Sequence, residues 1–330
     1  GQRIVVVSHT NPDGDAVGSS LAWAEVLRTM GHAVTCVVPN KYPYFLDWMP
    51  GIDEVVIFKT DTEGRARRAI AEADMIFCLD FNAVSRLEIL SDTIEANTTA
   101  RRVLIDHHLS PDEGFDLMFS HPDSSSTCFL VYSIVEAMCG AGAITRRISE
   151  SLYVGMMTDT GNFAFSFLTP ELFRAVAVLV EKGISIPDIH NSVYNAYTEG
   201  RARLFGYAIN RKMEVIQDGT VAYMSLLENE MRRFQFQQGD SEGFVNYPLT
   251  IKKMKMSAMF LGHHKFIRVS LRSRGDVDVN LFARKYFDGG GHKNAAGGKS
   301  YVSMDETIAH YIRSVEEFAR EGGLDTPPLR

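Results

Sequence analysis

Short apolar runs rich in β-branched residues alternate with helix-compatible segments along the N-terminal third of the chain. The helix-compatible segments include Ala16–Met30 and Thr62–Ala73. Almost continuously apolar strands that alternate with helices predict an α/β fold, with a parallel sheet covered on both faces. The expected strands are Ile4–Ser8, Ala33–Val38, Val55–Lys59, Met75–Asp80 and Val103–Asp106.

The pattern becomes helical after the last of these strands. Apolar residues recur at helical spacing in Phe129–Met138, Ile144–Met157 and Pro170–Lys182. Ser126 or Thr127 is placed to cap the first of these helices. These helices complete the first predicted domain.

A second, smaller domain of mixed α/β type is expected towards the C-terminus. Strand-like runs return at Val221–Leu226, Lys255–Phe260 and Phe266–Leu271, and an amphipathic helix follows at Met304–Arg320. The tail Asp325–Pro328 is expected to be frayed.

The length of the chain also indicates two domains. Single hydrophobic cores stop growing at about 250–300 residues, and this chain has 330 residues, of which 45% are hydrophobic. We expect a first domain at 1–185, a helical linker at 186–210 and a second domain at 211–330.

The cysteines and the apolar segments bear on localisation. Four scattered cysteines, without a C-x-x-C pair, indicate free thiols in a reducing cytoplasm. No signal-peptide pattern is present, and no apolar stretch reaches the roughly 18 residues of a membrane span. We therefore expect a cytoplasmic protein without a membrane partner.

The charge of the chain is unevenly distributed. The net charge is −7, which argues against a general nucleic-acid binder. Residues 206–300 contain 15 Lys and Arg against 9 Asp and Glu, so this stretch carries +6 and the remainder −13. The C-terminal part can therefore attract a polyanion, although an uneven solvated surface is the simpler alternative.

Histidines and aspartates stand at the ends of predicted elements in four groups. Three groups lie at the carboxyl end of a predicted strand. In an open α/β sheet, loops leaving neighbouring strands converge on one crevice, so these residues can meet there. The groups are His9 with Asp13 and Asp15, Asp80, Asp106–His107–His108, and Asp159.

Each group alone has a simpler explanation. The turn Asp13–Asp15 is typical of helix capping, and Asp80 or Asp159 can cap a turn or end a helix. The turn is no calcium EF-hand, because Gly14 lies at the wrong position and Ala22 stands where the bidentate glutamate belongs. Together the groups favour Mn²⁺ or a related first-row metal, and a bridging carboxylate can hold two ions about 3.5–4 Å apart.

A glycine-rich run, Gly289–Gly298, lies in the second predicted domain. Its small residues allow backbone N–H groups to approach an anion, although its spacing matches no nucleotide-binding fingerprint. A flexible surface loop is the alternative. Phosphate capture is favoured by His292 and the upstream Arg268, Arg272 and Arg284, since arginine offers forked donors.

The order of the motifs resembles that of a known family. HTNPDGD at 9–15, Asp80, DHH at 106–108, MTDTG at 157–161 and GGGHKNAAGG at 289–298 look like the DHH phosphoesterase superfamily. The resemblance covers nearly the whole chain, and its C-terminal part is similar to the DHH-associated domain of the first subfamily. The size is similar to the NrnA-like oligoribonuclease and 3′-phosphoadenosine-5′-phosphate phosphatase branch.

The resemblance implies a role for each residue. Two divalent ions, Mn²⁺ with Mg²⁺ or Co²⁺ as alternatives, would activate water in a cleft between the domains. His108 would face the scissile phosphate, and Asp106 would orient a ligand histidine. One metal would be held by His9, Asp13 and Asp80, and the other by Asp15, Asp80, His107 and Asp159. The substrate phosphate would be bound by Gly289, Gly290, Gly291, His292, Arg268 and Arg272.

The expected substrates are very short RNA or small nucleotides, including 3′-phosphoadenosine 5′-phosphate. Alternatives are a RecJ-like single-strand exonuclease and a phosphodiesterase for linear or cyclic dinucleotides. A non-catalytic nucleotide-binding regulator represents a different class, but decay of an active site should remove metal ligands, and all are present. No obligate protein partner is indicated, and a homodimer is compatible with the sequence.

Overall fold

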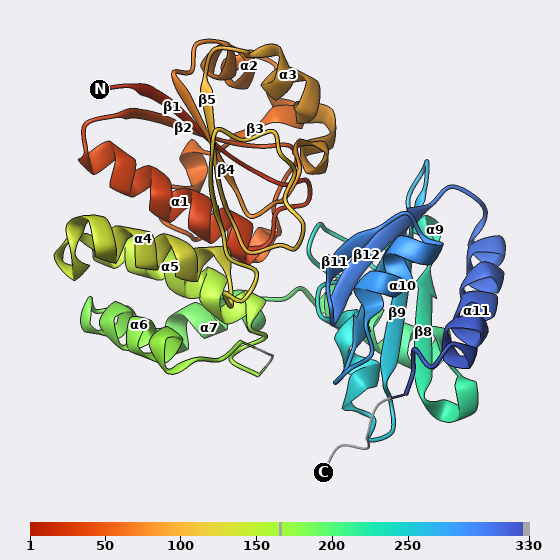
Figure 1. Cartoon of the computed structure of the whole chain (residues 1–330). Coiled ribbons are helices and arrows are strands. Elements are labelled where there is room, and N and C mark those ends of the chain that lie inside the picture. The colour runs from red at the N-terminus through yellow and green to blue at the C-terminus, as the bar shows by residue number, and fades with distance from the viewer. Residues whose placement is uncertain (165–166, 326–330) are drawn as a thin grey trace. The chain divides into compact units, whose positions relative to one another are not determined.

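The computed structural model describes residues 1–164 and 167–325, and divides into two compact units, Gly1–Ala196 and Tyr197–Arg330 (Figure 1). Most of the tail that was expected to be frayed lies outside the described residues. Among the described residues, no helix combines the length and the apolar character that crossing a membrane requires.

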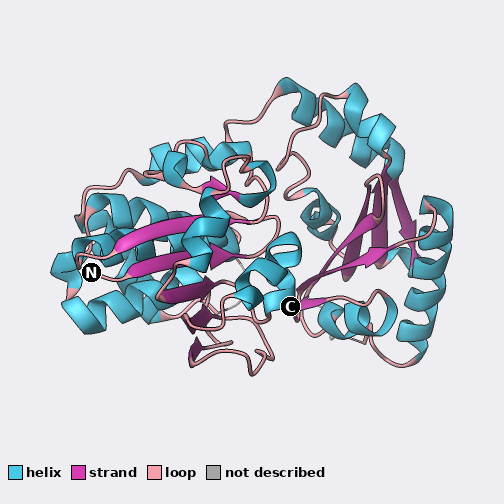
Figure 2. Cartoon of the chain, turned by 90° about the horizontal axis from the view of Figure 1, so that it is seen from above, coloured by secondary structure: helices cyan, strands magenta, loops and turns pink. Residues whose placement is uncertain are grey.

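The first unit is built on a six-stranded parallel sheet in the order β3-β2-β1-β4-β5-β6, which confirms the predicted fold class. In Figure 2 its strands lie between helices. The order reverses between β1 and β4, the position at which doubly wound sheets bind ligands. The strands are β1 (Arg3–Ser8), β2 (Ala33–Val38), β3 (Val56–Ile57), β4 (Met75–Leu79), β5 (Arg101–Asp106) and β6 (Leu117–Ser120).

Two groups of helices cover this sheet. On one face, α2 and α3 pack Ile70 and Ile94 into a core with strand residues such as Val5 and Ile76. On the other face lies α1, packed against α4 and α5 (Figure 1). The helices are α1 (Gly14–Thr29), α2 (Arg65–Ala71), α3 (Ser91–Ala96), α4 (Thr127–Cys139), α5 (Arg146–Asp159), α6 (Pro170–Glu181) and α7 (Ile186–Tyr194). Short 3-10 helices lie at Tyr44–Leu46, Ile52–Glu54, Phe58–Thr60, Val84–Leu90 and Ala141–Ala143.

The two edge strands of this sheet differ from the prediction. The strand expected at Val55–Lys59 is only β3, because it pairs with two residues of β2 before a 3-10 helix begins. The strand β6 was not expected, because Leu117 and Met118 are exposed and give no buried pattern. Its backbone nevertheless pairs with β5 in parallel.

Glycines allow α1 and α5 to approach each other closely. A Cβ atom on Gly18 would lie 2.4 Å from the carbonyl oxygen of Ser151, and one on Gly155 would lie 2.2 Å from Sγ of Cys128. The contact of Gly18 with Ser151 is a backbone contact between α1 and α5, which only glycine fits. Cys128 belongs to α4, but a Cβ atom on Gly155 would also lie 2.6 Å from Oδ1 of Asp15 in α1. This approach brings the start of α1 next to the end of α5.

The second unit has a six-stranded mixed sheet in the order β11-β12-β10-β9-β8-β7, in which only β8 and β9 are parallel neighbours. One face packs on α10 and α11 through Phe282 and Tyr311. The strands are β7 (Met213–Ile216), β8 (Val221–Leu226), β9 (Met256–Gly262), β10 (Ile267–Ser273), β11 (Gly290–His292) and β12 (Ala295–Ser300). The helices are α8 (Glu199–Tyr207), α9 (Glu228–Arg233), α10 (Val279–Tyr286) and α11 (Met304–Arg320), with a π-helix at Ala208–Lys212 and 3-10 helices at Gln217–Gly219 and Phe244–Thr250.

The predicted linker at 186–210 is divided between the two units at Ala196. In α7, Ile189 and Val193 are buried within the first unit, whereas Leu204 of α8 joins a core cluster of the second. Each helix has an apolar face that its own unit buries, so little of the segment remains as connecting chain.

The glycine-rich run forms a β-hairpin, β11–β12, instead of a loop. A Cβ atom on Gly289 would lie 1.9 Å from the carbonyl oxygen of Gly297, so the glycines permit tight strand packing. The N–H groups of Gly289 and Gly291 donate to the carbonyl of Ala283 and the side chain of Asn280. Two of the N–H groups expected to face an anion are therefore bonded within the unit.

The close contact between α1 and α5 predicts that Gly18→Ala destabilises the first unit by about 1–3 kcal/mol, as overpacking does. Trp23 and Trp48, the only tryptophans of the chain, both lie in this unit, so their fluorescence reports its unfolding in urea. Gly142→Ala is the control, since its Cβ would meet no atom within 4 Å. Equal midpoints for the two variants would contradict the packing argument.

Candidate metal centre

Three adjacent strands deliver the central residues of the site to one sheet edge. His9 follows β1, Asp80 follows β4, and Asp106 ends β5 just before His107 and His108. These strands are direct neighbours in the sheet. The residues that follow these three strands therefore meet at the carboxyl edge of the sheet, as predicted.

The start of α1 and the end of α5 add three carboxylates. Asp13 caps α1, because its Oδ1 accepts the N–H groups of Asp15 and Ala16 at 3.0 and 3.1 Å. Asp15 lies in the first turn of the same helix, and Asp159 is the last residue of α5. The capping role proposed as an alternative for Asp13 is thus present, and it uses only one carboxylate oxygen.

Among the described residues of the first unit, the side chains form three groups that could hold a metal ion: two ligand sets built only from predicted metal ligands, and a third group of Asp80, Asp106 and His108. In each set, one ligand atom per residue lies within 4.8 Å of the others. Such mixtures of carboxylate and imidazole suit first-row divalent metals. The first set is His9, Asp13 and Asp80, and the second is Asp15, His107 and Asp159.

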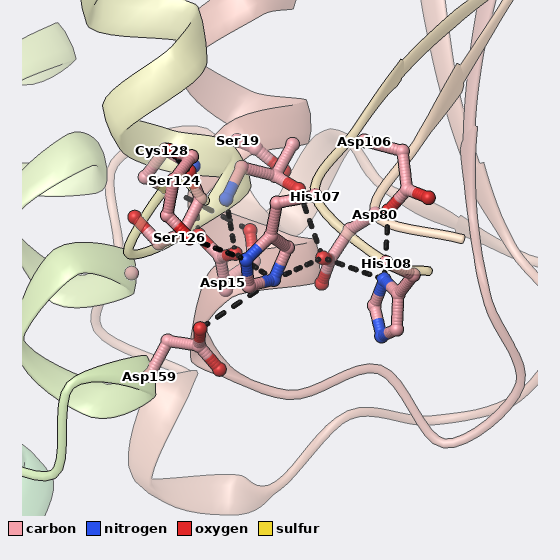
Figure 3. A network of polar contacts seen from close by, with 12 residues as sticks. Asp15, Ser19, Asp80, Asp106, His107, His108, Ser124, Ser126, Cys128 and Asp159 are labelled. Atoms are coloured by element: carbon pink, nitrogen blue, oxygen red, sulfur yellow. Dashed lines mark hydrogen bonds and ion pairs between the residues drawn. The ribbon is translucent and has the colours of Figure 1, made fainter. Parts of the chain in front are cut away.

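Asp80 belongs to the first set and also reaches a histidine of the second. Its Oδ2 is 3.5 Å from Nε2 of His9, and its Oδ1 is 3.6 Å from Nε2 of His107, as the dashed contacts of Figure 3 show for His107. The two oxygens of one carboxylate therefore face different histidines. The backbone of Asp80 has a φ of 65°, an uncommon value that aspartate tolerates better than most residues.

The orientation of both histidines is fixed by backbone carbonyls. Nδ1 of His9 lies 2.9 Å from the carbonyl oxygen of Thr10, and Nδ1 of His107 lies 3.1 Å from that of Ser124. A proton on Nδ1 makes each of these a donated hydrogen bond. The lone pair of Nε2 then faces the carboxylates, as metal coordination requires.

The partner of Asp106 differs from the one that the resemblance implied. Its Oδ1 accepts a hydrogen bond of 2.7 Å from Nδ1 of His108, whereas the carbonyl oxygen of Ser124 contacts His107, the histidine predicted to bind metal (Figure 3). Burial alone would raise the pKa of Asp106, but the hydrogen bond and charge of His108 hold it below the usual value. Asp106 therefore orients His108, with Nε2 on the far side of the ring.

The N-terminus of α4 provides contacts that sequence reasoning missed. The N–H groups of Thr127 and Cys128 donate to Asp15 at 2.6 and 2.8 Å, and Oγ1 of Thr127 donates to Asp80 at 2.9 Å. Helix N-termini favour negative charge through their N–H groups and dipole. The sequence did place a helix start at Ser126 or Thr127, but it gave no sign of which carboxylates would meet it.

The buried site has an excess of negative charge. Burial, with the charges of Asp15, Asp13, Asp159 and Asp106, raises the pKa of Asp80 well above its usual value. Burial likewise raises the pKa of Asp15 and lowers that of His9. Buried carboxylates this close require compensating charge. Bound cations provide it, so the donor set fits divalent metals.

The predicted phosphate-binding residues lie together in the second unit. Arg272 pairs with Ala295, which pairs with His292, so the arginine and the histidine share one face of the sheet. Arg268 lies on the same face of β10, since side chains alternate along a strand. The apolar residues between them, such as Val269, face the α10–α11 core.

Comparison with known proteins agrees with this architecture. Residues 3–156 match the DHH family, N-terminal domain, and residues 218–321 match the DHHA1 domain. The chain is similar to two proteins named bifunctional oligoribonuclease and PAP phosphatase NrnA. The one from Thermus thermophilus is 26% identical, covering 97% of this chain and 92% of the relative; the one from Bacillus subtilis is 25% identical, covering 92% and 90%.

A solved structure is also similar over nearly the full length. The crystal structure of an exopolyphosphatase-related protein from Bacteroides fragilis has a TM-score of 0.88 and 41% identity, covering 96% of this chain and 92% of that chain. A parallel α/β domain that gathers these carboxylates and imidazoles, followed by a mixed α/β domain, defines a DHH-type phosphoesterase. The chain belongs to the DHH family, in its NrnA-like branch, and is a hydrolase of phosphoester bonds.

The charge repulsion predicts that Asp80→Asn stabilises the metal-free protein at pH 7.5 by about 0.5–2 kcal/mol, as relief of strain at active sites often does. The folded pKa of Asp80 lies above the unfolded value of about 3.9, so wild type gains stability from this group as pH falls towards that value. The variant should lack this gain.

Tryptophan fluorescence during urea unfolding in a chelator measures both effects. The exposed Glu95→Gln, also in the first unit, is the control and should behave as wild type. A metal-free Asp80→Asn protein that is less stable than wild type at pH 7.5 would refute the repulsion.

Proposed function

We propose that this protein is a Mn²⁺-dependent two-metal phosphoesterase that hydrolyses very short oligoribonucleotides and 3′-phosphoadenosine 5′-phosphate. The observation that carries the two-metal proposal is that Asp80, a member of the first ligand set, also faces His107 of the second set. The relatives named for oligoribonuclease and PAP phosphatase activity support the substrates. The net charge of −7 argues against tight binding of long strands.

In this proposal the two ligand sets hold one metal each and share Asp80. A bound metal pair supplies a water of lowered pKa as nucleophile and neutralises charge on the phosphoryl oxygens. Thr127 and the backbone at the start of α4 hold Asp80 and Asp15 in place by donating hydrogen bonds. The carbonyl oxygens of Thr10 and Ser124 accept hydrogen bonds from Nδ1 of the two ligand histidines, so Nε2 is the ring atom that would hold a metal.

The Asp106–His108 pair acts on the substrate. The hydrogen bond from Nδ1 to the buried carboxylate of Asp106 orients the imidazole of His108, with Nε2 on the far side of the ring. Nε2 then donates to a phosphoryl oxygen or protonates the leaving oxygen. His292, Arg272 and Arg268 of the second unit bind the substrate phosphate, with Gly289, Gly290 and Gly291 allowing a close approach.

A substrate panel with Mn²⁺ tests the proposal directly. The panel contains 3′-phosphoadenosine 5′-phosphate, di- to pentanucleotides, a strand of about 30 nucleotides, pyrophosphate and inorganic polyphosphate, at one fixed salt concentration because salt shifts such affinities. We expect the highest kcat/KM for the short nucleotides. Preference for the longest strand would favour a RecJ-like exonuclease, and preference for polyphosphate would overturn the nucleotide assignment.

The shared position of Asp80 predicts that chelation abolishes turnover, that Mn²⁺ restores it, and that Asp80→Ala is the most damaging single ligand change. Loss of one preorganised charge-stabilising group typically costs about 10²–10³-fold in kcat, and a bridge affects both ions. The comparison is with His9→Ala and Asp159→Ala, each belonging to one set. Near wild-type kcat for Asp80→Ala would exclude the bridging role.

The assignment of His292 to the substrate predicts that His292→Ala lowers kcat/KM while the protein keeps its full complement of Mn²⁺. Loss of a charge-assisted hydrogen bond costs roughly 1.5–3 kcal/mol, which corresponds to about ten- to a hundred-fold. Metal content by mass spectrometry, measured beside the kinetics, separates the two roles. A matching loss of Mn²⁺ would show that His292 is a metal ligand.

A further inference from the structure

A groove of about 510 Å³ lies at one end of the sheet in the second unit. Its walls come from three segments: the β9–β10 turn at 262–267, the start of α9, and residues 301–304 between β12 and α11. One acidic residue, Glu228, lines the groove and is paired with Arg232 at 3.1 Å.

We call this groove, beside the turn of the β9–β10 hairpin, the hairpin groove. Aromatic rings line it. His263 stacks on Phe266 with ring centres 5.0 Å apart and an interplanar angle of 25°, and Tyr301 lies 6.5 Å from Phe266. Burial, with the charge of Arg268, lowers the pKa of His263, so its ring is neutral at neutral pH. Tyr301 is 76% exposed, so its ring is accessible to a ligand in the groove.

The hairpin groove lies at one end of the sheet face that carries Arg268, Arg272 and His292. Ile267 pairs with Ser300 and Arg268 with Lys299, so one more step along the same register sets Phe266 opposite Tyr301. Because alternate residues share a face, these rings stand in line with Arg268, Lys299 and Arg272. Lys299 links the two parts, with Nζ 5.1 Å from the centre of the Phe266 ring.

The remainder of the same face is already covered by the protein. The residues of β9 opposite Ser270 and Arg268 are Met259 and Leu261, and these are buried in an apolar cluster with α8. The strip on β10, β12 and β11 carries arginine, lysine, histidine, glycine and alanine instead. One face of this sheet is therefore apolar and buried at β9, but basic and able to attract an anion at β10, β12 and β11.

The length of this strip sets the size of a matching ligand. From Arg272 to Phe266 is six residues, or roughly 20 Å at about 3.3 Å per residue. At about 3.4 Å per stacked nucleotide this equals about six nucleotides, and fewer in an extended strand. A ligand that reaches from the phosphate-binding end to the rings therefore has more than two nucleotides.

We infer that the hairpin groove binds downstream bases of a single-stranded oligoribonucleotide, stacked on Tyr301 and Phe266, while its terminal phosphate lies at His292 and Arg272. Base stacking on aromatic side chains beside a cationic backbone track is how single strands are held without sequence preference. The inference rests on the proposed function and adds a site that distinguishes oligonucleotides from 3′-phosphoadenosine 5′-phosphate.

The test compares substrates of different length in Tyr301→Ala. Stacking on one ring is worth about 5- to 100-fold in binding, so kcat/KM for a pentanucleotide should fall by that factor while dinucleotide and 3′-phosphoadenosine 5′-phosphate turnover stays unchanged. Tyr301→Phe keeps the ring and should match wild type. Tyr247→Ala removes another exposed tyrosine of the same unit and should also match it.

Equal loss on all substrates, or no loss on the pentanucleotide, would overturn the inference and leave the proposed function intact. Binding of a fluorescent pentanucleotide to the metal-free proteins, followed by anisotropy, decides the matter without turnover. If wild type hydrolyses no nucleotide, the proposed function fails; binding that weakens in Tyr301→Ala then still supports the groove. If the pentanucleotide does not bind, or binds Tyr301→Ala as tightly as wild type, the inference about the groove is wrong.

Discussion

The buried negative charge around Asp80 is the constraint on which the rest of the first unit depends. Aspartates that follow β4, begin α1 and end α5 come within reach of two buried histidines, and Asp15 and Asp80 among them are buried. Protein hydrogen bonds offset part of this charge: Thr127 donates to Asp80, and the start of α4 donates to Asp15. The remainder requires cations, so the stability of the unit and its proposed catalysis are linked through the same carboxylates.

The packing of the helices follows from the same constraint. Asp15 and Asp159 belong to different helices, and they meet because α1 and α5 approach at glycine contacts that leave no room for a Cβ atom. The residues Gly18 and Gly155 are therefore part of the site, although neither offers a ligand. In the second unit, the glycines of β11 and β12 have a comparable effect, since they allow these strands to pack closely beside β10, which carries Arg268 and Arg272.

The sequence predicted elements that have a strong pattern of their own. The strands Ala33–Val38 and Val221–Leu226 and the helix Met304–Arg320 match the structure to the residue. Elements that depend on tertiary pairing were missed: β6 lacks a buried pattern, and β11 and β12 consist largely of glycine and alanine, which are depleted in strands.

The candidate site was predictable for a related reason. Its ligands follow strands whose parallel order brings their ends together, and adjacency could be expected from the α/β pattern alone. The hydrogen-bond partners of these residues could not be predicted from the sequence. The hydrogen bond from His108 to Asp106 and the role of Thr127 depend on side-chain geometry that spacing along the chain does not encode.

Electron paramagnetic resonance of the Mn²⁺-loaded protein tests the central claim most directly, because a carboxylate shared between two ions couples their spins. The account predicts two Mn²⁺ per chain with the spectrum of an exchange-coupled pair, and loss of that coupling in Asp80→Asn. A wild-type protein that binds a single ion, or two ions with the spectrum of isolated Mn²⁺, would contradict it.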